Sequence, residues 1–292
     1  MKKILAALIS LLPLLNGCGT YVPSIREWPK NDTLNESDMI AAIIRSVSCE
    51  LSYTVTQVIE NDKREALDRS SKKTYSDFLR EWGVEVAVNL TVVERTSVNP
   101  SVLFTPPITP TTTFTLSGGF TASAEATRLQ KTNVFFTIDE LYHPAFFNVD
   151  KPERRCRDPR GNKEGSLLVD SDLKLSSLLE GRIGASILGF ADTPSSPALL
   201  VGQKNVLSQS VSFKIVTAGG LTPTWKLVRA TYNPTGILLS TGRDRTHELV
   251  FTFGPLDKSV KGRPWRLTPL AEQTHLNTQL QTGLRGFGGP FQ

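Results

Sequence analysis

Three cysteines carry most of the scope for chemistry in this chain. Cys18 follows a short apolar stretch near the start, Cys49 lies within a periodic apolar segment, and Cys156 lies in a charged, turn-rich stretch. Three thiols are too few for a four-thiolate zinc site or for a disulfide-rich scaffold. Each cysteine therefore needs its own explanation.

The histidines and the known catalytic motifs add little. None of His143, His247 and His275 stands at a recognisable metal-ligand spacing from another histidine, cysteine or carboxylate. The sequence contains no nucleophile elbow, zinc-protease helix, phosphate-binding loop or dinucleotide fingerprint. We therefore expect no metal site and point to no catalytic residue.

The first twenty residues have the layout of an export signal. Lys2 and Lys3 form a positive start, and an apolar stretch of twelve residues runs from Ile4 to Leu15. That stretch is too short to cross ~30 Å of hydrocarbon, but it suits the apolar core of a signal peptide. It leads into a cysteine through Leu15-Asn16-Gly17-Cys18.

This tetrad resembles the lipobox of bacterial lipoproteins. The resemblance implies that the Cys18 thiol receives a diacylglyceryl group, that cleavage follows Gly17, and that the new amino terminus is acylated. This lipid is the only non-protein group that we expect. Gly19 resembles the outer-membrane default of enteric bacteria, so the expected location is an outer-membrane lipid anchor with the domain facing the periplasm. The alternative is an ordinary secretory signal in which Cys18 is incidental.

With Cys18 assigned to the lipid, Cys49 and Cys156 remain as a pair in an oxidising compartment. Cys49 lies nine residues, or about 180° of helix, from Ile40, on the side opposite an apolar stripe. A partner explains that placement better than burial of a free thiol does, so we predict a Cys49–Cys156 disulfide. The rival is a reactive Cys156, because neighbouring arginines would lower the pKa of its thiol.

Those arginines belong to a basic stretch. Arg154, Arg155 and Arg157 could contact anionic envelope material, although solvated loops are the commoner explanation of such clusters. Loss of Lys2 and Lys3 with the signal lowers the net charge of the chain from +5 to +3. A nearly neutral exported chain without a known module is a poor nucleic-acid binder, so we expect no nucleic-acid partner.

Hydrophobic periodicity predicts the elements that must position these residues. An apolar repeat every three or four residues predicts a helix of about five turns from an N-cap at Ser37, with further helices at 72–82, 173–188 and 269–280. Alternation predicts strands at 84–93, 114–126, 132–139, 211–217, 225–232, 237–240 and 248–253. Turns are expected at 128–131, 218–223 and 241–245, and the proline-rich stretch 97–113 is not expected to form a central strand.

The order of these elements predicts an α+β fold with antiparallel sheet packed against several helices. The expected organisation is a signal peptide at 1–17, a lipidated tether at 18–36, one domain at 37–283 and a flexible glycine-rich tail at 284–292. A subdivision of the domain near 150–205 is left open.

We expect a lipid-anchored envelope protein with a non-catalytic binding or structural role. Its partners would be the membrane, through the lipid, and an envelope protein or glycan. Two alternatives stay open: an envelope hydrolase acting on peptidoglycan or glycan, and a lipoprotein displayed on the cell surface.

Overall fold

The computed structural model describes residues 21–25, 36–105, 114–146, 172–189, 206–226, 230–234, 236–257 and 266–287. Its helices and antiparallel sheets confirm the α+β class. The chain divides into two compact units, and the expected domain bounds stay a prediction. Unit 1 comprises Met1–Ile25, Leu90–Gln130 and Lys214–Thr246, and unit 2 comprises Arg26–Asn89, Lys131–Phe213 and His247–Gln292.

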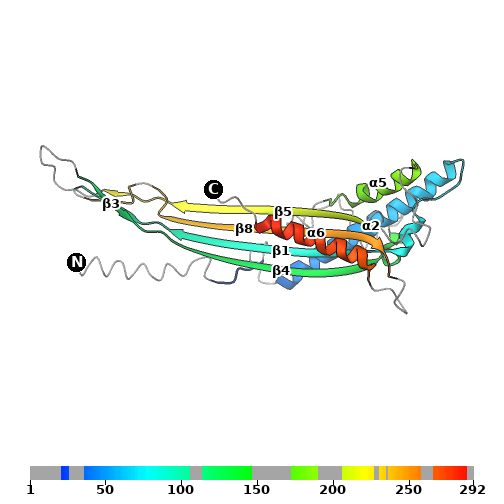
Figure 1. The fold of residues 1–292 in the computed structure, drawn as a ribbon, viewed down its shortest axis with the longest axis horizontal. Helices are drawn as coiled ribbons and strands as arrows, with labels where there is room; N and C mark the ends of the chain where they lie inside the picture. Colours follow the sequence, from blue (N-terminus) through cyan, green and yellow to red (C-terminus); the bar gives the residue numbers. More distant parts are fainter. Residues whose placement is uncertain are drawn as a thin grey trace. The chain divides into compact units, whose positions relative to one another are not determined.

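Four strands contribute to both units. They form one sheet in the order β4-β1-β8-β5, which Figure 1 draws from bottom to top. Their bounds are β1 (Trp82–Val98), β4 (Ala122–Thr137), β5 (Leu207–Leu221) and β8 (Leu239–Pro255). The divisions between the units therefore fall inside these four strands.

Side-chain contacts show how the central strands run. In unit 2, Asn89 of β1 donates to Glu248 of β8 over 3.3 Å, and in unit 1 the hydroxyl oxygens of Ser97 and Ser240 are 2.6 Å apart. Residue numbers rise along β1 as those of its neighbours fall along β8, so the two strands are antiparallel.

The outer strands follow the same rule. Phe135 of β4 lies beside Gly83 of β1 in unit 2, and Glu125 lies beside Arg95 in unit 1. On the other side, Ser208 of β5 lies near Thr252 of β8, and Thr217 donates to the carbonyl of Arg243. Directions therefore alternate across all four strands.

A second, smaller sheet lies wholly within unit 1, in the order β3-β2-β7-β6. Its strands are β2 (Ser101–Phe104), β3 (Leu116–Gly119), β6 (Trp225–Lys226) and β7 (Ala230–Tyr232). The prediction for 97–113 is wrong here, because β2 is a central strand. It fits between Pro100 and Pro106, so no proline interrupts its ladder.

The turns predicted at 128–131 and 241–245 are also wrong, since β4 and β8 are continuous there, and β5 runs on to Leu221. The polar residues that suggested these turns lie on sheet faces that are only partly buried. Strand propensity depends on such surroundings, and pairing with the neighbouring strands overrides it.

Unit 2 covers both faces of its part of the sheet. The helix α6 (Pro269–Phe287) lies over one face, where a Cβ on Gly254 of β8 would meet the Ala271 side chain at 2.7 Å. On the opposite face Val84, Val86 and Val88 of β1 are buried, and Figure 1 shows α2 (Glu36–Asp68) crossing behind the sheet. The result is a three-layer arrangement with a buried core.

The helix α2 is longer than predicted. It already includes Ser37, so the predicted N-cap at that residue is wrong, and it extends to Asp68. The predicted helix at 72–82 is a short 3₁₀ turn, η2 (Asp77–Glu81). The residues directly before η2 are held by Asp62, whose carboxylate accepts hydrogen bonds from the backbone N–H groups of Tyr75 and Ser76 at 2.7 Å each.

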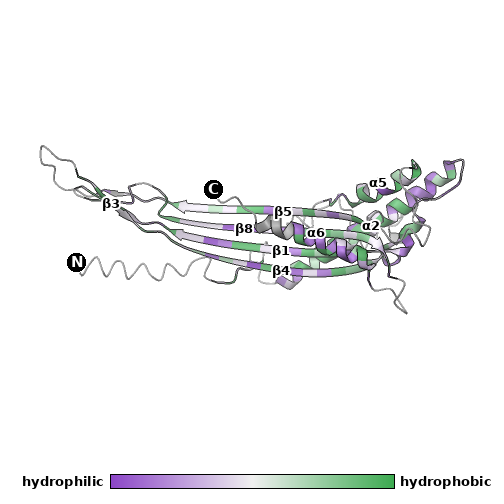
Figure 2. Cartoon of the chain, viewed as in Figure 1, coloured by the Kyte–Doolittle hydropathy of each residue, from purple (hydrophilic) through white to green (hydrophobic). Residues whose placement is uncertain are grey.

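Three short elements pack on the outer side of α2. They are α3 (Ile138–Leu141), which begins with a Thr137/Glu140 capping box, η3 (Pro144–Phe146) and α5 (Leu175–Ile187). Figure 2 shows apolar and polar residues alternating around both α2 and α5. The helices predicted at 173–188 and 269–280 are confirmed, although α6 continues to Phe287 into the predicted tail.

Candidate functional site

Most of the predicted site residues lie outside the described part of the chain. These are Gly17, Cys18, Arg154, Arg155, Cys156 and Arg157. Cys49 is described, and it is disulfide-bonded. The pairing with Cys156 stays a prediction, because neither of the other two cysteines falls within the described residues.

The surroundings of Cys49 differ from the expectation. The side of α2 opposite the apolar stripe was expected to face solvent, yet Cys49 and Glu50 are both buried. The reason is that α5 packs on this side of α2. Sequence periodicity showed one buried stripe and could not show the second.

Glu50 is a buried acid whose pKa is strongly raised. Only 4% of the residue is exposed, and its carboxylate accepts the backbone N–H of Leu173 at 2.7 Å. Burial raises the pKa of Glu50 to about 7, and nearby Asp172 adds to the rise, while the Leu173 bond and Lys174 act in the opposite direction. Glu50 thus ties the chain entering α5 to α2, through a group that titrates near neutrality.

A second buried polar group lies between α6 and the sheet in unit 2. The imidazole of His275 contacts Thr252 of β8 through Nδ1 at 2.9 Å and Gln279 through Nε2 at 2.7 Å. Burial lowers the pKa of His275 to about 4, so the ring is neutral at pH 7. Because the amide nitrogen of Gln279 can only donate, Nε2 of His275 accepts and its Nδ1–H donates to the Thr252 hydroxyl.

One carboxylate approaches this histidine. Glu85 of β1 lies 3.7 Å from Nε2 of His275, and its pKa is raised by burial and by the charge of Glu272. A hydrolase would need such an acid pair beside an open cleft. Two hollows in the described part of the chain lie in unit 1.

The other histidines have structural surroundings. His247 is buried on β8, and the backbone N–H of His143 donates to Thr56 of α2 over 3.0 Å. Within the described ranges, no three His, Cys, Asp or Glu side chains form a group that could hold a metal ion. No described helix has the length and apolar character needed to span a bilayer.

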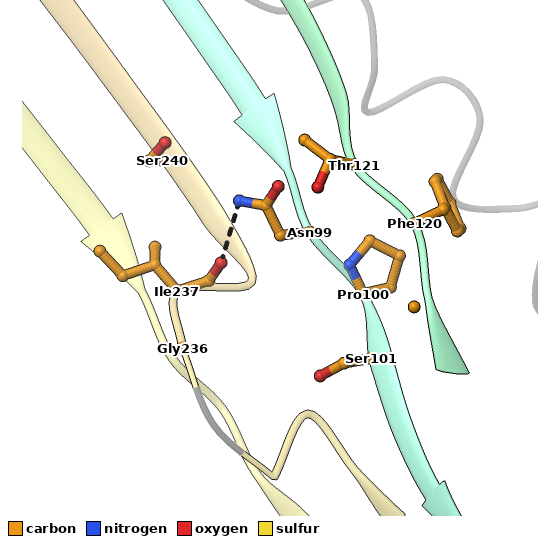
Figure 3. A pocket seen from close by; sticks show the side chains of 9 residues that line it. Asn99, Pro100, Ser101, Phe120, Thr121, Gly236, Ile237 and Ser240 are labelled. Carbon is orange, nitrogen blue, oxygen red and sulfur yellow. Dashed lines mark hydrogen bonds between the residues drawn. The ribbon is translucent and has the colours of Figure 1, made fainter. Parts of the chain in front are cut away.

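Unit 1 presents the open surfaces. One hollow of about 550 Å³ lies where the larger sheet gives way to the smaller one (Figure 3). Its lining includes Asn99, whose amide donates to the carbonyl of Ile237 over 3.3 Å, and the side chain of Phe120, which is 65% exposed. Pro100, which lies between β1 and β2, also lines the hollow, and its carbonyl accepts the backbone N–H of Phe120 over 3.2 Å.

Asn233 holds the smaller sheet together beside this hollow. It is buried with φ of 50°, in the left-handed region that asparagine tolerates. Its backbone N–H donates to the Ser101 carbonyl at 2.7 Å, and its side-chain amide donates to the Pro223 carbonyl at 2.9 Å. Asn233 thereby ties the β6–β7 hairpin to β2.

One face of the smaller sheet is apolar and exposed. The register pairs Phe104 with both Leu116 and Ala230, and Tyr232 lies two residues further along β7 on the same face. Phe104, Leu116 and Tyr232 are 42%, 58% and 42% exposed. We call these three side chains the apolar face of unit 1.

On the larger sheet, a slanted row of charges crosses all four strands of unit 1. Glu125 on β4 pairs with Arg95 on β1 at 2.7 Å, Arg95 pairs with Asp244 on β8 at 3.3 Å, and Asp244 lies 3.8 Å from Lys214 on β5. The signs alternate, with an acid at the β4 edge and a base at the β5 edge. We call these four residues the charge row.

The segment 21–25 lies on the opposite face of the same sheet. Arg128 of β4 donates to the carbonyl of Pro23 over 3.3 Å, and Arg243 of β8 donates to the carbonyl of Ser24. Arg243 also pairs with Glu94 of β1 at 3.1 Å, and Ile25 is fully buried. The segment 21–25 is therefore bound to the sheet of unit 1.

Sequence reasoning missed the charge row and the apolar face. Glu125 and Arg95 are thirty residues apart, and Arg95 and Asp244 are further apart still, so only the strand register brings them together. The run Arg243-Asp244-Arg245 lies in the predicted turn at 241–245, and a turn prediction does not say that neighbouring charges point to opposite faces of a strand. The alternating exposure of β4 was the one available signal.

No protein-family model matches the chain, and no curated protein sequence matches it. Among solved structures, the Salmonella SPI-1 type III secretion injectisome secretin InvG in the open gate state has a TM-score of 0.16 at 9% identity. That match covers 69% of this chain and 66% of the other. A second InvG structure has a TM-score of 0.14 at 11% identity, covering 69% and 71% of the two chains. Likenesses this low carry no argument about the fold or the function.

Proposed function

We propose that this chain is an exported lipoprotein, anchored to the outer membrane through acyl groups on Cys18, with a non-catalytic structural or binding role in the cell envelope. The observation that carries the proposal is the tetrad Leu15-Asn16-Gly17-Cys18 after a short apolar stretch. Several acyl chains anchor a protein stably, since each buried CH₂ contributes about 0.8 kcal/mol.

The structure adds a physical link between the anchor and unit 1. Pro23 and Ser24 are bound to Arg128 and Arg243, and Cys18 precedes Pro23 by five residues. Five residues span at most about 18 Å, so lipid on Cys18 would hold unit 1 close to a membrane surface.

The open surfaces of unit 1 support binding rather than catalysis. Its hollows are lined mainly by small, hydroxyl and amide side chains, together with the Arg95–Glu125 ion pair. The perturbed acids and histidine, Glu50, Glu85 and His275, belong to unit 2 and serve its internal contacts. The proposed partners are the membrane and an envelope protein or glycan.

The anchor is tested by replacing Cys18 with serine in the producing cell. We expect the Cys18→Ser protein to take up no labelled fatty acid and to leave the membrane fraction. Cys156→Ser makes the same chemical change at another cysteine and should keep both the label and the membrane fractionation. A Cys18→Ser protein that still carries label, or a wild-type protein that carries none, would overturn the proposal.

A further inference from the structure

The larger sheet ends in two open edges within unit 1. These are residues 122–130 of β4 and 214–221 of β5, the outer strands in the order β4-β1-β8-β5. In the described part of the chain no further strand pairs with either of them. Neither segment contains a proline, one of the devices by which proteins block an exposed edge.

Unit 1 also lacks the covering layers of unit 2. All the described helices belong to unit 2, and in unit 1 the segment 21–25 lies on the sheet. Leu129 on β4 and Val216 on β5 are 46% and 58% exposed. A sheet normally needs a second layer or further strands to bury its apolar side chains, which points to a missing neighbour.

The two edges are complementary in direction. Because directions alternate across an even number of strands, β4 and β5 run in opposite directions. A second copy placed beside the first in the same orientation therefore brings its β4 antiparallel to β5 of the first. The antiparallel ladder then continues from one copy to the next.

The two edges are also complementary in charge. The charge row has Glu125 at the β4 edge and Lys214 at the β5 edge, and these side chains are 53% and 59% exposed. Joining β5 of one copy to β4 of the next brings Lys214 beside Glu125 of the next copy. The alternation of signs then continues across the junction, and like charges meet nowhere along it.

We propose that copies of this chain associate edge to edge, with residues 214–217 of β5 pairing antiparallel with residues 122–125 of β4 in the next copy. The contact joins two different surfaces, so it generates a closed ring if the rotation between copies closes and an open chain if it does not. The inference goes beyond the proposed function and does not need the lipid, although anchored copies would meet more often.

Paired cysteines test the contact in the full-length, detergent-solubilised protein. Beside a Lys214–Glu125 contact, antiparallel register brings Val216 next to Ser123, two exposed residues on the face of the charge row. We expect Ser123→Cys/Val216→Cys to give a ladder of crosslinked dimers, trimers and larger species with a short bismaleimide. Each single variant, and the wild type, should stay at the monomer position.

The single variants distinguish the proposed contact from its competitors. Crosslinking of Ser123→Cys alone or of Val216→Cys alone would mean that like edges meet, which contradicts the proposal. If the double variant gives no crosslinked species, the proposal is overturned, even if the protein has an oligomeric mass in solution. A mixture of the two single variants should give a heterodimer and nothing larger.

A charge reversal provides a second measurement that does not depend on crosslinking. Lys214→Glu places two acids at the junction, and we expect the mass measured by light scattering to fall toward that of the monomer. Lys174→Glu is the matched control, because Lys174 is an exposed lysine in unit 2 that likewise pairs with an aspartate. Equal masses for the two variants would contradict the proposal. If Cys18→Ser leaves the membrane yet still crosslinks at high concentration, the anchor and the contact are independent.

Discussion

The same four strands run through two very different surroundings. In unit 2 the central strands β1 and β8 are largely buried on both faces, with α6 over one face and α2 on the other, whereas the outer strands β4 and β5 are partly exposed there. In unit 1 the exposure of β4 and β5 alternates or is continuous, and charged side chains stand on both faces. Strand formation therefore requires only pairing, whereas a core requires covering layers.

The two units also differ in how they hold their ionisable groups. Unit 2 holds its ionisable groups in closed contacts, such as Glu50 with Leu173 and His275 with Thr252. Unit 1 exposes its groups to solvent along edges and faces that a neighbour could cover. On this account unit 2 supplies stability, and unit 1 supplies the interaction surfaces.

The largest expected difference is the cost of removing an aromatic side chain. Phe251 on β8 is fully buried in unit 2, so Phe251→Ala should lower the free energy of unfolding by about 3–5 kcal/mol. Phe104 belongs to the apolar face of unit 1, and Phe104→Ala should cost less than about 1 kcal/mol in the monomer. Urea unfolding followed by far-ultraviolet circular dichroism measures both. Similar losses for the two variants would break the comparison.

The next effect concerns the dependence of stability on pH. Because the pKa of Glu50 is about 7 when folded, against 4.5 as the ordinary value, the folded state binds more protons between these limits. Its contribution to stability is therefore lost as the pH rises from 4.5 to 7, by at most about 3 kcal/mol. Glu50→Gln keeps a neutral hydrogen-bond acceptor that does not titrate. Its free energy of unfolding, measured relative to that of the wild type, should therefore be higher at pH 8 than at pH 4.5.

His275 acts in the opposite sense and cancels from that difference. With its pKa lowered to about 4, its contribution is lost as the pH falls from 6.5 to 4, in wild type and variant alike. Unfolding curves of wild type and Glu50→Gln that stay parallel from pH 4.5 to pH 8 would show that Glu50 is not held in its buried contact.

The smallest effect compares two strand glycines. A Cβ at Gly254 would come within 2.7 Å of the Ala271 side chain of α6, so Gly254→Ala should cost about 1–3 kcal/mol by pushing the helix off the sheet. A Cβ at Gly118 in β3 meets no atom within 4 Å, so Gly118→Ala should change stability by less than about 1 kcal/mol. Thermal melts of the two variants measure the difference.

Periodicity predicted much of unit 2 and little of unit 1. The apolar stripe of α2 and the alternation at 84–93 mark surfaces that are buried, and burial is what such patterns record. In unit 1 the strands around Arg128 and Arg243 carry charges on both faces, so their patterns resemble turns. The charge row and the open edges depend on strand register, which no local pattern contains.

The central claim is that the open sheet edges of unit 1 pair with the edges of other copies of this chain. Hydrogen–deuterium exchange followed by mass spectrometry tests it most directly. In dilute monomer, we predict slow exchange for 82–89 and 247–255 in unit 2 and fast exchange for the edge segments 122–130 and 214–221 in unit 1. In the crosslinkable assembly, residues 122–125 and 214–217 of these segments should become slow together. Edge segments already as protected in the monomer as the strands of unit 2 would contradict the account.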